Sequence, residues 1–118
     1  MSWVPRRGEV VNVFAGTKNN RPGVVFWVED EGVLVIYVVC WGTGTDPELR
    51  RKNGDPHQPC VTVEKASPDG QALALDKDTW FYPRECGPFE LADLSPRLGA
   101  VPCPRPLLDQ LTRLHRRR

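Results

Sequence analysis

The sequence has few histidines, no closely spaced cysteine pair and no long apolar segment. His57 and His115 are the only two histidines, so a histidine-pair mechanism would require both to converge in the fold. The four cysteines form no CxxC motif, which argues against a zinc site of the usual spacing. No apolar run approaches the roughly 20 residues needed to span a bilayer. We therefore expect no metal, no cofactor and no membrane partner.

The sequence also lacks a strong charge of either sign. Its net charge is only +1, so bulk electrostatics does not favour binding to nucleic acid, and an RNA site would have to be a local patch. Arginine outnumbers lysine twelve to four, and the guanidinium group suits bidentate acceptors such as phosphate. The segment from Met1 to Gly8 is short and basic without an apolar stretch, so we expect a cytoplasmic protein with reduced thiols.

The 118 residues predict one domain, spanning 1–118, that is mainly β. Twelve prolines and ten glycines suit short strands joined by tight turns better than long helices. The first three predicted strands follow one another closely and suggest an antiparallel meander. The third is almost continuously apolar, which predicts burial on both faces. The strands are expected at Glu9 to Phe14, Val24 to Val28, Val33 to Trp41, Cys60 to Lys65 and Thr79 to Tyr82.

The C-terminal part predicts a helix. Leucines recur at helical spacing from Pro106 to Arg116, and proline suits the first turn, so this segment should form an amphipathic α-helix. A short helical turn around Leu94 to Leu98 is a further candidate. Ala15 to Arg21 and Ser67 to Gly70 are expected to be turns or loops. Gly42 to Pro59 has the period of neither helix nor strand, which indicates a long loop that is either functional or disordered.

Five segments, taken in order, resemble the MazF/PemK toxins, and together they touch most of the chain. They are R-R-G-E-V-V-N-V at Arg6 to Val13, N-N-R-P-G-V-V-F at Asn19 to Phe26, V-L-V-I-Y-V-V at Val33 to Val39, L-D-K-D-T at Leu75 to Thr79, and L-S-P-R-L-G at Leu94 to Gly99.

This resemblance implies a small SH3-like antiparallel β-barrel of the CcdB/PemK type with a C-terminal amphipathic helix. It further implies the toxin component of a type II toxin-antitoxin system, which forms a homodimer and inhibits growth. Such a toxin is a metal-independent, sequence-specific endoribonuclease that cleaves single-stranded RNA, typically mRNA. A cognate antitoxin protein would be its partner.

The resemblance also indicates catalytic residues. Arg21 matches the arginine of the family's R-P motif, which acts at the scissile phosphate. The family's threonine usually follows the buried strand at once, where this chain has Trp41 and Gly42, so Thr43 is the nearer candidate and Thr45 the reserve. The family often carries an arginine and an acid before the R-L-G-like stretch. Asp93 matches the acid, Glu90 stands in the arginine's place, and Arg84 could substitute from the neighbouring turn.

The chemistry of RNA cleavage suits these residue types without any appeal to a family. The 2′-hydroxyl of RNA can attack the adjacent phosphate, and the enzyme must then move a proton and stabilise negative charge. The donor fork of Arg21 can hold two phosphate oxygens, while a threonine hydroxyl donates one hydrogen bond. The general base stays open between Glu9, Glu90, Asp93 and an activated arginine. Candidate RNA-binding residues are Lys18, Asn19, Asn20, Arg50, Arg51, Lys52 and Arg84.

Structural roles compete with each of these assignments. Arg21 could be a solvated turn residue, and Thr43 and Thr45 could cap their own loop. Aromatic strand residues such as Trp41 and Trp80 more often fill a core than stack on bases. The alternative function is a non-catalytic binding module, either an inactive family member or a protein that acts through protein-protein binding in the manner of a gyrase poison.

Overall fold

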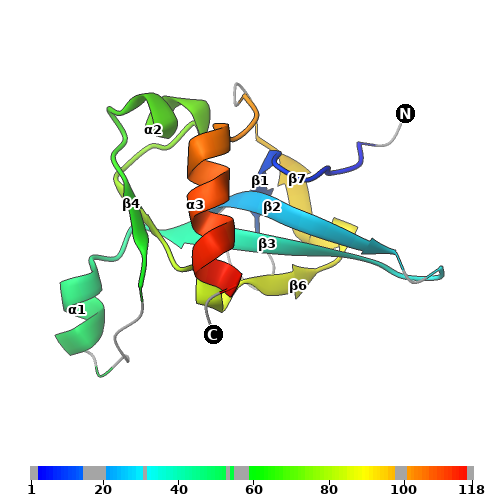
Figure 1. The fold of residues 1–118 in the computed structure, drawn as a ribbon, viewed down its shortest axis with the longest axis horizontal. Coiled ribbons are helices and arrows are strands. Elements are labelled where there is room, and N and C mark those ends of the chain that lie inside the picture. The colour runs from blue at the N-terminus through cyan, green and yellow to red at the C-terminus, as the bar shows by residue number, and fades with distance from the viewer. Residues whose placement is uncertain are drawn as a thin grey trace.

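The computed structural model describes residues 3–14, 21–30, 32–52, 54, 59–97 and 101–116. The fold is mainly β with a C-terminal helix, as the sequence predicts (Figure 1). No helix in this described part is long and apolar enough to cross a membrane. Its elements are β1 (Val10–Val13), β2 (Arg21–Asp30), β3 (Val35–Thr43), α1 (Pro47–Lys52), β4 (Val61–Val63), α2 (Pro68–Ala72), β5 (Thr79–Phe81), the 3₁₀ turn η1 (Pro83–Glu85), β6 (Gly87–Phe89), the 3₁₀ turn η2 (Leu91–Asp93), β7 (Leu94–Pro96) and α3 (Arg105–Arg116).

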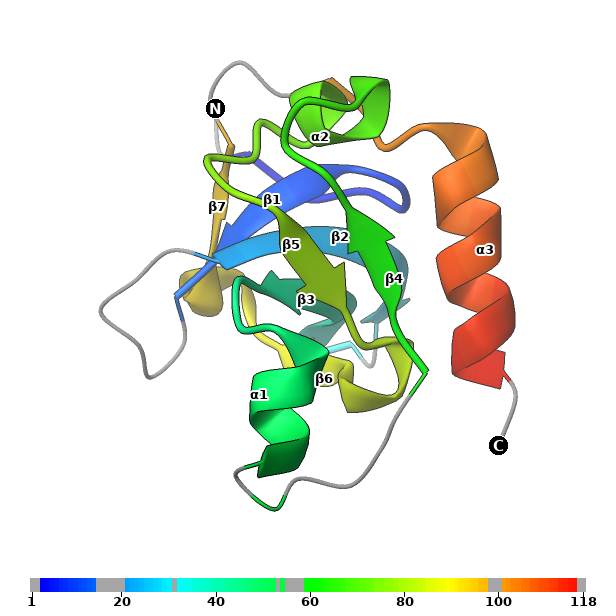
Figure 2. The same cartoon turned by 90° about the vertical axis from the view of Figure 1, so that its left-hand side faces the viewer.

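The strands form one antiparallel sheet in the order β4-β5-β3-β2-β1-β7, with β6 as a further neighbour of β3 (Figure 2). The predicted meander of the first three strands is confirmed, because β2 pairs with both β1 and β3. β4 and β7 are the two edges of the sheet. Among the described strands, no pairing joins these edges to close a barrel.

Strand β3 organises the sheet because both of its edges are paired. One edge pairs with β2, while the other is divided between β6, which pairs with Tyr37–Val39, and β5, which pairs with Gly42 and Thr43. Gly42 is needed at the second junction, since a Cβ there would overlap the side chain of Thr79 on β5. The absence of a side chain therefore allows β5 to approach the end of β3.

The sheet is covered by apolar side chains on both faces, as the continuous apolar pattern of β3 predicts. Alternate residues of β3 point to opposite sides, so Cys40 belongs to one buried cluster and Val39 to the other. The larger cluster is Val10, Val24, Phe26, Cys40, Val61, Val63, Leu73, Leu75, Phe81, Cys103, Leu107, Leu108 and Leu111. The smaller cluster is Val11, Val13, Val25, Tyr37, Val39 and Leu94.

Helix α3 covers the face of the larger cluster (Figure 1). It begins at Arg105, one residue before the predicted start, and its leucines at helical spacing turn toward the sheet. Leu107, Leu108 and Leu111 are buried, and Leu114 packs at the margin. Burying each such leucine stabilises the fold by roughly 1.5–3 kcal/mol relative to leaving it exposed.

The prediction of an unstructured loop from Gly42 to Pro59 is wrong in its first half. Gly42 and Thr43 still belong to β3, and α1 follows from Pro47 to Lys52. The side chain of Asp46 accepts a hydrogen bond from the Glu48 amide at 2.7 Å, which satisfies an amide of the first turn. The D-P-E sequence at 46–48 is therefore a helix start that was overlooked because the helix has only six residues.

Four further elements differ from prediction. The segment around Leu94 is strand β7 and not the predicted helical turn. A helical turn does occur just before it, in η2, where Glu90 and Asp93 form a capping box. Ser67 caps α2, so Ser67 to Gly70 is the beginning of a short helix. β3 lies two residues later than predicted, and β2 extends beyond Val24–Val28 at both ends.

Arg97 ties the segment after α2 to the first strand. Its guanidinium donates to the carbonyls of Leu73 and Ala74 at 2.6 and 2.5 Å and to the side chain of Asn12 at 2.7 Å. Burial lowers the pKa of Arg97, and the nearby Asp76 carboxylate acts in the opposite direction. These bonds fix the turn in which Ala74 adopts a positive φ of 54°.

Replacing Leu111 by alanine is expected to lower the free energy of unfolding by about 2–5 kcal/mol, because Leu111 is fully buried between α3 and the sheet. Denaturant unfolding checks this. The exposed neighbour Gln110 provides the control, since Gln110→Ala should change stability by no more than about 0.5 kcal/mol. Equal effects of the two changes would contradict the assigned helix face.

The thiol of Cys103 predicts a loss of stability at alkaline pH. Burial, with a smaller contribution from Asp69, raises its pKa to about 12. Above a pH of about 8.5 the thiol of the unfolded chain ionises while that of the folded chain does not, so folding stability falls. We expect the wild type to lose stability relative to Cys103→Ala as the pH rises from 9 toward 11. Parallel pH profiles of the two proteins in urea unfolding would contradict this.

Candidate functional site

Arg21 is the first residue of β2 and is exposed, rather than lying within a loop as predicted. It pairs with Val13 of β1, and Val13 pairs on its other edge with Leu94 of β7. Directly opposed residues of an antiparallel sheet project to the same face. Val13 and Leu94 both belong to the smaller cluster, so Arg21 extends from the face opposite α3.

Thr43 is the last residue of β3 and lies at the same end of the sheet. β2 and β3 pair with Gly23 opposite Trp41 and Val24 opposite Cys40. Continuing this register by two residues brings Thr43 level with Arg21. Thr43 and Trp41 are two positions apart on one strand and therefore share a face, and Trp41 packs against the smaller cluster. Arg21 and Thr43 thus occupy the same face at the same end.

The hydroxyl of Thr43 holds the turn that follows β3. Its oxygen accepts a hydrogen bond from the Thr45 amide at 3.2 Å, so the two predicted threonines lie together. This bond is the local capping role that competes with catalysis. The hydroxyl hydrogen of Thr43 is not used by this bond and can be donated to an oxygen of a ligand.

Lys77 is a basic residue at this turn that sequence reasoning did not single out. A Cβ built on Gly44 would lie 2.7 Å from the Lys77 ammonium nitrogen, so the lysine side chain lies across the turn between Thr43 and Thr45. The Thr79 hydroxyl donates to the Lys77 carbonyl at 2.9 Å and helps to fix the backbone there. Lys77 is part of the L-D-K-D-T segment, but nothing in a single sequence indicates that it faces Gly44.

Two aromatic rings line the same face beside these polar groups. Trp41 is half-buried and meets Phe89 of β6 edge to face, with ring centroids 5.4 Å apart. A partly exposed tryptophan next to a basic group is a surface on which a nucleic-acid base can stack. The position of Trp41 is thus compatible both with packing and with contact to a ligand.

Helix α1 carries the predicted basic run and lies on the side of the molecule where β3 ends (Figure 2). Arg51 and Lys52 are exposed there, and Arg50 belongs to the same helix. Only three residues separate the end of β3 from the start of α1, which keeps this basic segment near Thr43. Lys18, Asn19 and Asn20 lie outside the described residues.

The candidate general bases are divided between the two faces. Glu90 and Asp93 form a reciprocal capping box, in which the Asp93 carboxylate accepts from the Glu90 amide at 3.1 Å. The segment that contains them joins β6 to β7, and Phe89 and Leu94 on these strands belong to the smaller cluster or pack against it. Glu9 instead lines a cavity against α3.

Arg84 lies next to α3 and His115 is part of α3, so both are on the α3 side of the molecule and not on the face of Arg21. Arg84 is exposed on η1, which packs against α3. His115 Nδ1 lies 2.7 Å from the carbonyl oxygen of Pro83, and its ring contacts Phe26 and Trp27. His57 lies outside the described residues, and in the described part no three His, Cys, Asp or Glu side chains form a group suited to a metal.

Neither the protein-family models nor the curated proteins compared with this chain match it. The function is therefore argued from the residues and geometry of the chain itself. Those residues are a guanidinium, a threonine hydroxyl and a lysine ammonium at one end of the sheet, beside a half-buried tryptophan. Positive donors of this kind suit an oxyanion such as a phosphate.

Replacing Thr43 by valine should release the amide of Thr45. The valine keeps the β-branched shape but removes the accepting oxygen, so the bond worth about 1 kcal/mol is lost and amide exchange at Thr45 should accelerate about fivefold. Thr43→Ser retains the oxygen and is the matched control. Hydrogen exchange followed by NMR would contradict the assigned turn if Thr45 stayed equally protected in both variants.

Proposed function

We propose that this chain is a metal-independent endoribonuclease that cleaves single-stranded RNA. The observation that carries the proposal is the register of β1, β2 and β3, which supports Arg21 and Thr43 as neighbours on one face. The finer architecture proposed with it is a partly open SH3-like barrel of the CcdB/PemK type. The corresponding biological role is that of a MazF/PemK-like toxin of a type II toxin-antitoxin system, acting on mRNA in the cytoplasm.

The proposed chemistry is attack by the 2′-hydroxyl on the adjacent phosphorus. The O2′–P bond forms while the P–O5′ bond breaks, which leaves a 2′,3′-cyclic phosphate and a free 5′-hydroxyl. Arg21 is suited to hold two non-bridging oxygens and stabilise the charge that develops on them. Thr43 can donate its hydroxyl hydrogen to the same phosphate, and Lys77 adds positive charge beside it.

Proton transfer in this scheme requires an acceptor for the 2′-hydroxyl proton and a donor for the leaving 5′-oxygen. Glu90 and Asp93 are the two proposed carboxylates, since they belong to the segment between Phe89 and Leu94, which lies at the smaller cluster. Either would have to leave the capping box, or share its oxygens with it, in order to accept the proton. An activated arginine remains the other proposed acceptor.

Recognition of the RNA is assigned to groups around the phosphate site. Trp41 can stack on a base, while Arg51 and Lys52 on α1 can follow the backbone away from the cut. An antitoxin would compete for the same surface, for which a disordered acidic segment that folds on binding is suited. A homodimer belongs to the same proposal.

The proposed activity predicts chelator-resistant cleavage that depends on Arg21. A long single-stranded RNA incubated with wild-type protein in chelator should be cut at specific sites, with cyclic phosphate ends. Arg21→Ala should lower the rate by about 10²–10³-fold, the usual effect of removing one group that stabilises transition-state charge. Lys65→Ala is the control, because Lys65 is exposed on the turn after β4.

Each outcome of this experiment is informative when the variants are shown to be folded. Cleavage that persists in Arg21→Ala would remove Arg21 from the mechanism. A folded wild type that leaves RNA intact would contradict the nuclease proposal itself. Loss of cleavage in Lys65→Ala as well would mean that general charge and not the Arg21 site is responsible.

A non-catalytic binding module is the second candidate, and two observations favour it. The Thr43 oxygen is already engaged by the Thr45 amide, and the Glu90 and Asp93 carboxylates are engaged by η2. Under this alternative the same face would bind a protein, in the manner of a gyrase poison, without cutting RNA. Its expected result is growth inhibition by wild-type protein with cellular RNA intact.

A further inference from the structure

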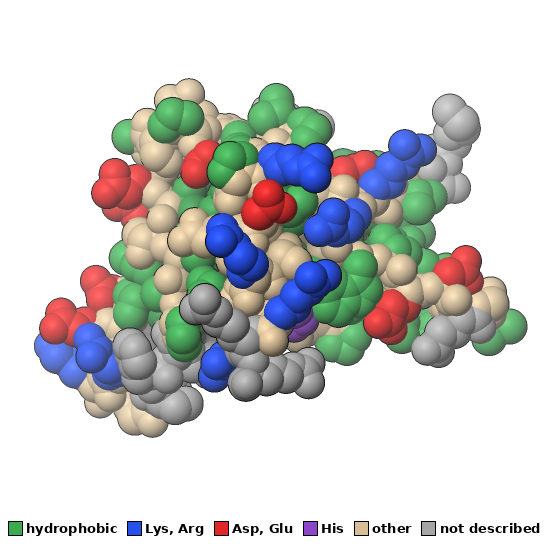
Figure 3. Space-filling model, viewed as in Figure 1, with side chains coloured by type: hydrophobic (Ala, Val, Ile, Leu, Met, Phe, Trp, Pro, Cys, Tyr) green, Lys and Arg blue, Asp and Glu red, His purple; other side chains and the backbone are tan. Residues whose placement is uncertain are grey.

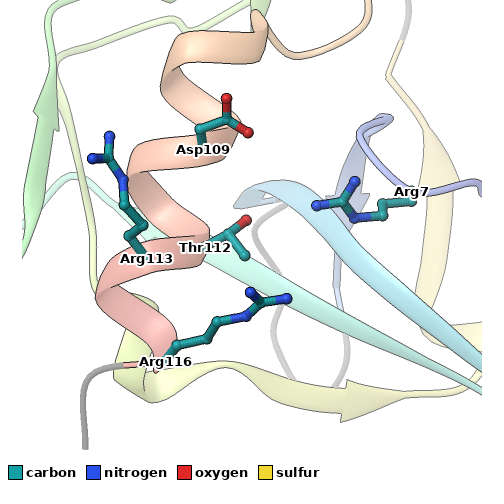
Figure 4. Close-up of a pocket in the computed structure, with 5 residues that line it drawn as sticks. All are labelled: Arg7, Asp109, Thr112, Arg113 and Arg116. Atoms are coloured by element: carbon teal, nitrogen blue, oxygen red, sulfur yellow. The ribbon is translucent and has the colours of Figure 1, made fainter.

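A second basic site lies on the other face of the molecule, between α3 and the N-terminal segment. Space-filling shows Lys and Arg side chains gathered on this face (Figure 3). A cavity of about 500 Å³ opens there, a size typical of small-ligand pockets. Its lining residues are Arg7, Asp109, Thr112, Arg113 and Arg116 (Figure 4). The lining residues thus include three arginines and one acidic residue, and the guanidinium groups of Arg7 and Arg116 face one another (Figure 4).

Arg7 is held in place from the sheet side of this cavity. Its Nε donates to the Phe26 carbonyl at 2.9 Å, and its two terminal nitrogens are directed toward α3 (Figure 4). Because one donor is already fixed by the backbone, the rest of the guanidinium fork is oriented before any ligand arrives. Arg7 is therefore a prearranged donor and not a freely rotating surface charge.

The helix side supplies the opposing charges. Arg116 extends toward Arg7 across the cavity, and Thr112 projects between them (Figure 4). The Thr112 hydroxyl donates to the Leu108 carbonyl at 2.7 Å, which fixes its side chain against the helix. Arg113, the next residue along α3, also lines the cavity, but its guanidinium extends along the other side of the helix, away from Arg7 (Figure 4). Like charges gathered in this way repel one another, and an anion bound between them would relieve that repulsion.

The basic surface continues along α3 into a neighbouring cavity of about 390 Å³. Arg7 and Asp109 line both cavities, so together they form one feature, here called the α3 groove. Arg6 and Arg105 line its far end together with the carboxylate of Glu9, so in the α3 groove the described arginines outnumber the acidic residues. From Arg105 to Arg116 the helix rises about 16 Å at 1.5 Å per residue, which is long enough to accommodate several phosphates of one strand.

Two aromatic rings pack together at the C-terminal end of α3, where Arg116 also lies. Trp27 is half-buried, and its ring lies 5.1 Å from the ring of His115, the residue before Arg116. The indole nitrogen donates to the Glu29 carboxylate at 3.0 Å, which fixes the plane of the ring. Arginine forks next to a fixed aromatic ring are the combination with which proteins grip a backbone phosphate and stack a base.

We infer that the α3 groove binds the phosphate backbone of single-stranded RNA at a site separate from Arg21 and Thr43. This inference rests on the proposed function, since it assigns a further part of the same RNA to a second surface. Guanidinium groups arranged around a compact cavity, with an aromatic neighbour, suit nucleotides better than the evenly spaced carboxylates of an acidic peptide. The groove adds affinity for RNA that extends beyond the cut site.

The test uses a 2′-O-methyl RNA of about 16 nucleotides, which binds but cannot be cleaved because it lacks the attacking hydroxyl. Binding is measured by fluorescence anisotropy over a range of salt concentrations. Arg116→Gln should weaken binding about fivefold to tenfold and reduce the slope of log K against log salt by about 0.7, the value for one lost phosphate contact. Lys65→Gln removes the same charge from an exposed turn and should change neither quantity.

Equal behaviour of the two variants, or no change in either, would overturn the inference. Poly-L-glutamate of matched charge should compete weakly. The contrary outcome is that poly-L-glutamate displaces the labelled RNA as effectively as unlabelled RNA does. If Arg116→Gln also weakened the binding of both polymers equally, the groove would be a site for acidic protein. If the wild-type protein binds RNA through the groove but never cuts it, only the nuclease proposal is contradicted. If Arg116→Gln cleaves and binds RNA normally, only the groove proposal is contradicted.

Discussion

The pairing of β3 on both of its edges is the constraint on which the rest of the structure depends. β2 occupies one edge, while β6 and β5 share the other, and Gly42 makes room for β5 at the end of the strand. Because side chains alternate along a strand, this pairing decides at once which residues enter each apolar cluster. A shift of one residue between β2 and β3 would move Thr43 to the other face and separate it from Arg21.

The two faces of the sheet carry different sets of side chains. One is covered by α3 and holds most of the core, with the α3 groove at its surface. The other has a smaller cluster and carries Arg21, Thr43 and Trp41 near its end. Polar groups mounted at the end of paired strands are held more firmly than groups on a free loop, and a phosphate site depends on such fixed donors.

The sequence predicted those features of the fold that depend on hydrophobic periodicity and composition. The meander, the apolar character of both faces of β3 and the amphipathic helix all follow from spacing. Short elements such as α1, β6 and β7 were missed or misassigned, because three to six residues carry too little pattern and are held by caps and pairing partners elsewhere in the chain.

The candidate sites divide in the same way. Arg21, Thr43 and Thr45 were chosen from motifs that resemble a known family, and the two threonines are joined by a single turn. Lys77 beside Gly44, and Arg7 across from Arg116, could not be found in this way. Each pair is distant in sequence and is brought together only by tertiary packing.

The proposed joint action of Arg21 and Thr43 on one phosphate is tested most directly by a double-mutant cycle on RNA cleavage. Rates would be compared for wild type, Arg21→Ala, Thr43→Val and the double variant, with folding of each verified. Strong coupling is expected, so that the double variant is scarcely slower than the slower single variant. Independent losses that multiply, or a single variant that cuts RNA at the wild-type rate, would contradict it.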